Sequence, residues 1–65
     1  MGNGQLFQQG ATLIEAKYRR GTDWATNQLN RAIWLTNTHP LTPTSLQEIL
    51  QYEFGIEWSN TSHSA

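Results

Sequence analysis

The clearest pattern of apolar and polar positions lies in the stretch from Thr22 to Thr36. On a helix of 3.6 residues per turn, its apolar side chains share one continuous arc of about half the circumference. These side chains are Trp24, Ala25, Leu29, Ala32, Ile33 and Leu35. The pattern predicts a helix over residues 23–37, and the width of the arc indicates that this helix packs against two neighbours.

Sequence signals mark both ends of this central helix. Thr22 or Asp23 is expected to cap its start, because a short side-chain oxygen accepts a hydrogen bond from a free N–H of the first turn. Pro40 is expected to end it, since proline disfavours helical backbone at His39 before it and has no N–H to donate.

A second apolar stripe precedes the central helix and predicts another helix over residues 5–20. Its apolar side is formed by Leu6, Phe7, Ala11, Leu13, Ile14 and Tyr18. Gly10 lies near this side, which indicates either a close helix crossing or a break after which the helix begins. Gly21 is expected to stop the helix at positive φ. The link to the central helix is then very short, so the two helices are antiparallel or sharply angled neighbours.

A third helix is predicted over residues 44–54. Thr42 or Thr44 is expected to cap its start. Its apolar side is formed by Leu46, Ile49, Leu50 and Phe54. Gly55 is expected to end it, with Ile56 folding back onto the last turn.

Together these patterns predict an all-α protein, a single small three-helix domain spanning residues 1–65. Residues 1–4 and the polar tail 59–65 are expected to be flexible. A chain of 65 residues has a core that rarely contributes more than about 3–5 kcal/mol. It contains no cysteine, which excludes disulfides and thiolate zinc sites as additional staples. Association with another molecule is the remaining way to gain stability.

Charge is scarce and unevenly placed. Charged residues make up 14% of the chain, and the formal net charge is −1. Residues 1–40 carry four basic and two acidic residues, whereas residues 41–65 carry three acidic residues and no lysine or arginine. This asymmetry favours either two copies packed head to tail or pairing between the two ends of one chain.

Candidate catalytic and metal-binding groups are sparse. His39 and His63 are far apart in the sequence and do not match the HExxH spacing of zinc sites. The serines have no GxSxG motif around them. Glu48, Glu53 and Glu57 are interpreted as a solvated acidic surface. We therefore expect no enzymatic activity, no cofactor and no bound metal.

The chain also lacks the usual signals for a membrane. No apolar run approaches the ~20 residues of a membrane-spanning helix. No charged segment followed by an apolar segment marks a signal peptide. No membrane association and a cytoplasmic location are expected.

A basic cluster at the end of the first predicted helix favours DNA binding as an alternative function. Lys17, Arg19 and Arg20 surround Tyr18, and Arg31 is counted as a further cation of this surface. The objections are the net negative charge and the absence of a basic recognition helix near the C-terminus. The same cations would also suit the negative end of their own helix.

Trp34 is the side chain that departs most from its surroundings. It lies on the polar side of the central helix, between Asn27 and Asn30, with Arg31 three residues before it. Tryptophan and arginine are enriched at the centres of protein interfaces. Trp58 could extend such a surface. The alternative is that the third helix or the tail covers Trp34 within one subunit.

We therefore predict a small non-enzymatic protein–protein interaction module that forms homo-oligomers, as a homodimer. It is expected to bind a larger protein as an adaptor, inhibitor or accessory subunit. The predicted contact residues are Asn27, Asn30, Arg31, Trp34 and Trp58. The alternative is a small DNA-binding regulator that uses Lys17, Arg19, Arg20 and Arg31.

Overall fold

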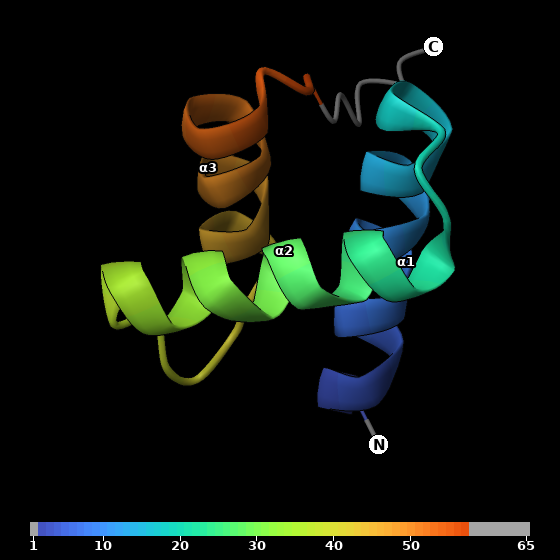
Figure 1. Cartoon of the computed structure of the whole chain (residues 1–65). Coiled ribbons are helices and arrows are strands. Elements are labelled where there is room, and N and C mark those ends of the chain that lie inside the picture. Colours follow the sequence, from blue (N-terminus) through green and yellow to red (C-terminus); the bar gives the residue numbers. More distant parts are fainter. Residues whose placement is uncertain (1, 58–65) are drawn as a thin grey trace, which may run out of the picture.

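The computed structural model describes residues 2–57, with side chains from residue 4 onward. Within these residues the chain forms three helices and no strand: α1 (Gly2–Tyr18), α2 (Thr22–Thr36) and α3 (Pro43–Phe54). α1 and α3 run in the same direction, and α2 crosses them at a steep angle (Figure 1). The predicted all-α, three-helix class is confirmed, as is the sharp angle between the first two helices. The tail 59–65 and Trp58 lie outside the described residues.

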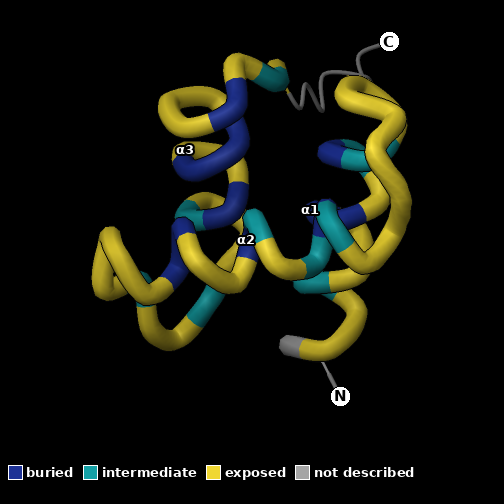
Figure 2. Tube along the Cα trace, in the orientation of Figure 1, coloured by how far each residue is buried: buried dark blue, intermediate teal, exposed yellow. Residues whose placement is uncertain are grey.

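The core is formed where the three helices face one another (Figure 2). Its buried side chains are Ala11, Ile14, Ala25, Leu29, Ala32, Ile33, Leu46, Ile49, Leu50 and Phe54. Leu6, Phe7, Leu13, Trp24, Leu41 and Ile56 are partly buried and pack against them. The core therefore draws on the apolar stripe of every helix, as the periodicity predicts.

Gly10 is buried at the crossing of all three helices. A Cβ atom on Gly10 would lie 2.8 Å from Cδ1 of Leu46 and 2.9 Å from Cδ2 of Leu29. α1 continues through this position without interruption. Of the two predicted roles for Gly10, the close crossing is confirmed and the break is wrong.

The ends of α1 and the start of α2 differ from the prediction. α1 begins at Gly2 and ends at Tyr18, because Arg19 adopts a left-handed conformation with φ of 54°. Gly21, with φ of 106°, is not the residue that stops α1 but the one that precedes α2. No side chain caps α2, so the predicted cap by Thr22 or Asp23 is wrong. Both residues already lie inside its first turn.

The remaining helix ends follow known capping geometry. Asn37, with φ of 54°, closes α2: its N–H donates to the Trp34 carbonyl and the Thr38 N–H donates to the Ile33 carbonyl. Thr42 caps α3, with its Oγ1 accepting from the Ser45 N–H at 3.1 Å.

The last turn of α3 closes as the sequence predicts. Gly55 adopts φ of 66°, and the Ile56 N–H donates to the Leu50 carbonyl at 2.8 Å. The predicted roles of Gly55 and Ile56 at this end are confirmed.

Leu35 is the one residue of the predicted apolar arc that does not join the core. Its side chain is 79% exposed. Leu35 lies in the last turn of α2, at an open hollow that it lines together with Glu53 and Phe54 of α3. In the described part of the chain, no helix is both long and apolar enough to span a membrane.

Candidate protein-contact surface

Trp34 lies on the surface of α2 and is 69% exposed. Its ring meets His39 edge to face, with 5.6 Å between ring centroids and an angle of 75° between the planes. α3 therefore leaves most of the indole open to solvent, in contrast to the alternative in which α3 covers it.

Four of the predicted contact residues share one exposed side of α2. Asn27, Asn30, Arg31 and Trp34 are spaced at i, i+3, i+4 and i+7, and each is exposed. Residues three and four apart are neighbours on a helix surface. We call these four residues the α2 outer face. The fifth predicted contact residue, Trp58, lies outside the described part of the chain.

An open groove runs between α2 and α3 beside this face. It consists of two adjoining hollows of about 260 and 280 Å³, with Glu53 lining both. The first hollow is lined by Thr36, Thr38, Ser45, Glu48, Ile49, Tyr52 and Glu53. The second is lined by Gln28, Arg31, Ala32, Leu35, Glu53 and Phe54. We call the two hollows together the α2–α3 groove.

Large apolar side chains border this groove without being covered. Leu35 is 79% exposed on the α2 side, and Tyr52 is 78% exposed on the α3 side. Sequence reasoning missed both. Leu35 was assigned to the core, whereas Tyr52 carried a usable signal, because it lies off the apolar stripe of its helix as Trp34 does.

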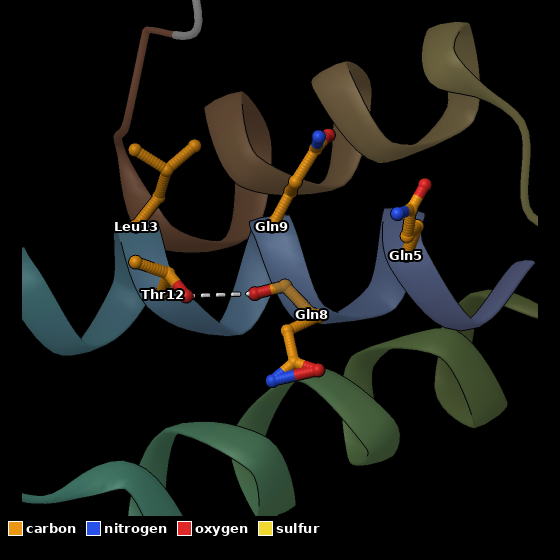
Figure 3. Close-up of a pocket in the computed structure, with 5 residues that line it drawn as sticks. All are labelled: Gln5, Gln8, Gln9, Thr12 and Leu13. Carbon is orange, nitrogen blue, oxygen red and sulfur yellow. Dashed lines mark hydrogen bonds between the residues drawn. The ribbon is translucent and has the colours of Figure 1, made fainter. Parts of the chain in front are cut away.

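A third and broader hollow lies along α1 (Figure 3). Its volume is about 620 Å³, and its lining residues are Gln5, Gln8, Gln9, Thr12 and Leu13. Thr12 uses its hydroxyl to donate to the Gln8 carbonyl at 2.9 Å. Side-chain amides can form hydrogen bonds with a ligand but carry no charge. Thr12 supplies the one hydroxyl among these lining residues, and none of the five has a side chain that could act as a general base.

The residues of the predicted basic cluster take part in contacts within the chain. Lys17 Nζ donates to the Phe54 carbonyl at 2.7 Å and to the Gly55 carbonyl at 3.4 Å. The Tyr18 hydroxyl donates to the same Phe54 carbonyl at 3.2 Å. These contacts are possible because α1 and α3 are parallel, which places the two C-terminal ends side by side. Lys17 thus satisfies the negative end of α3.

Arg20 and Arg31, two other cations of the cluster, have different neighbours. The Arg20 guanidinium lies 5.1 Å from the centre of the Trp24 ring, in the range of a cation–π contact. Arg31 lies more than two turns along α2, where it lines the α2–α3 groove. The structure therefore does not combine Lys17, Arg20 and Arg31 into one basic surface.

Among the described residues, no group of three or more histidine, cysteine, aspartate or glutamate side chains is arranged to hold a metal ion. Comparison of the chain with family models, with curated proteins and with solved structures gives no match.

Proposed function

We propose that this protein is a small non-enzymatic interaction module, which self-associates and binds a larger protein through the α2 outer face. The observation that carries the proposal is the position of Trp34. Its indole is 69% exposed in a chain with few residues to spare for its core. Such a module would serve as an adaptor, an inhibitor or an accessory subunit.

The chemistry of the α2 outer face supports a protein partner. A tryptophan brings a large apolar area together with an N–H donor. Arg31, one turn before it, adds a cation with several donors. Asn27 and Asn30 add amides that can both donate and accept. Tryptophan and arginine at the centre and adaptable polar groups around them are typical of interfaces with concentrated binding energy.

Loss of the indole tests the larger partner. In a pull-down from the native host, Trp34→Ala should lose one specific protein that the wild type captures, with binding weakened by about 30-fold or more. Gln8→Ala is the control, because it truncates an exposed residue that lies on α1 and not on the α2 outer face. Equal capture by wild type and Trp34→Ala would contradict the proposal.

The same experiment series separates this proposal from DNA binding. A gel shift across a salt series reports phosphate contacts, because binding that depends on them weakens steeply as salt rises. The proposal predicts no shift at low salt. A salt-sensitive shift that Arg19→Ala and Arg20→Ala weaken would favour the DNA-binding regulator instead.

A further inference from the structure

We infer that the α2–α3 groove is the surface through which two copies of this chain associate, with Arg31 of one copy facing Glu53 of the other. The inference rests on the proposed self-association and assigns it to a particular surface. In this assignment, Trp34 and its neighbouring asparagines remain free to contact the larger partner.

The two walls of the groove carry opposite charges. The α2 wall contributes Arg31. The α3 wall contributes Glu48 and Glu53, and residues 41–65 contain no lysine or arginine. A surface with one basic and one acidic wall is complementary to its own copy rather than to a strongly charged ligand of one sign.

In a two-fold symmetric dimer, the contact between the basic wall and the acidic wall occurs twice. In a symmetric dimer, residue i of one subunit contacts residue j of the other, and j contacts i. A two-fold axis that runs along the groove places the α2 wall of each subunit against the α3 wall of its partner. Arg31 then faces Glu53 in two equivalent places, and one dimer satisfies both walls of both subunits.

The same rotation covers the apolar side chains that the single subunit leaves exposed. Leu35 lies on the α2 wall and Tyr52 on the α3 wall, and each is more than three-quarters exposed at 79% and 78%. In the dimer, the Leu35 and Tyr52 side chains of both subunits lie within the contact. Apolar contact inside and charge pairing at its margin are the usual anatomy of a protein interface.

Asn27, Asn30 and Trp34 of the α2 outer face remain accessible in this arrangement, whereas Arg31 takes part in the dimer contact. On a helix, residues three and four positions after Arg31 lie on opposite sides of it. Leu35 is on the side that lines the groove, whereas Trp34 does not line it. Arg31 marks the boundary between the two surfaces, so one chain can contact a second copy and a larger protein together.

Charge exchange between subunits tests this geometry. Sedimentation equilibrium from about 1 to 500 μM gives the dimer dissociation constant for wild type, Arg31→Glu and Glu53→Arg. Each variant alone should weaken the dimer by about tenfold or more, because like charges then face each other. An equimolar mixture should regain an affinity within about threefold of wild type, since the mixed dimer has an opposite-charge pair at both contacts.

Two matched variants control for net charge. Arg19→Glu and Glu57→Arg make the same changes of charge away from the groove lining and should leave the dissociation constant within about twofold of wild type. Circular dichroism of every variant confirms the helical fold. An effect of the control variants equal to that of the groove variants would overturn the inference.

The outcomes distinguish this inference from the proposed function. A wild-type monomer at every concentration would overturn the proposed self-association and this inference with it. A dimer that neither groove variant weakens, or a mixture of the two that stays monomeric, would overturn the inference alone. If Arg31 instead attracts Glu53 within one subunit, the mixture of the two variants should stay monomeric. Mixing two chains cannot restore an ion pair inside either of them.

Discussion

Two regions of this small protein contain the same kinds of side chain and use them differently. Around the turn between α1 and α2, Lys17, Tyr18, Arg20 and Trp24 contact other parts of the chain. The rings of Tyr18 and Trp24 lie 5.4 Å apart, and Arg20 lies over Trp24. On the α2 outer face, Arg31 and Trp34 also combine a cation with an aromatic ring, yet both remain exposed.

The difference lies in what packs nearby. The first region faces the C-terminal end of α3, whose Phe54 carbonyl accepts hydrogen bonds from Lys17 and Tyr18. The second region lies on the outer side of α2, where Arg31 lines the open α2–α3 groove and the His39 ring lies beside Trp34. A basic and aromatic cluster is therefore a candidate binding surface only where the neighbouring helices leave its donors and rings largely exposed.

The largest effect is expected from two leucines of the same helix. Leu29 is fully buried and Leu35 is 79% exposed. Leu29→Ala should cost about 3 kcal/mol of unfolding free energy, because it removes buried methyl groups and leaves a cavity. Leu35→Ala should change it by less than about 0.5 kcal/mol. Urea unfolding followed by circular dichroism compares them, and equal losses would show that Leu35 is part of the core.

The next largest effect on unfolding free energy is expected at Gly10, where the helices cross. Alanine at Gly4 should stabilise α1 by up to about 1 kcal/mol through helix propensity, because a Cβ there meets nothing within 4 Å. Gly10→Ala has the same gain but must displace the ends of Leu29 and Leu46, at a cost of about 1–3 kcal/mol. Thermal or urea unfolding should rank Gly4→Ala above Gly10→Ala. The reverse order would mean that the helices cross less closely.

A smaller difference in unfolding free energy is expected between variants of Lys17 and Arg31, one cation from each region. Lys17→Met removes the donor to the Phe54 carbonyl and should cost about 1 kcal/mol of unfolding free energy. Arg31→Met, at an exposed position, should stay within about 0.5 kcal/mol of wild type. The two variants share the same change in charge, so their difference in urea unfolding reports the contact with α3. Identical stabilities would place Lys17 in solvent.

The sequence was sufficient to predict the three helices, because they depend on local pattern. It predicted the close approach at Gly10 and the cap at Thr42 each as one of two alternatives. The sequence did not predict that Leu35 is exposed, since periodicity identifies an apolar face but not how far a neighbouring helix extends along it. The role of Lys17 was missed for a similar reason. It requires α1 and α3 to end side by side, which depends on the packing of the whole chain.

The candidate surface was predicted in part. Asn27, Asn30, Arg31 and Trp34 were found because helical spacing places them together, and the structure exposes them all. The α2–α3 groove was not predicted, because its two walls come from helices whose relative position the sequence pattern does not specify. Tyr52, an aromatic residue outside the apolar stripe of α3, was the available signal.

The central claim is that a single subunit leaves the Trp34 indole in water so that another protein can cover it. The most direct measurement is the H2O/D2O isotope shift of the Trp34 resonance in ¹⁹F NMR of 5-fluorotryptophan-labelled protein, assigned with Trp34→Phe. The account predicts the shift of an exposed indole for the dilute protein, and its loss on addition of the protein captured in the pull-down. An indole without an isotope shift in the dilute protein, or with the same shift in the complex, would contradict it.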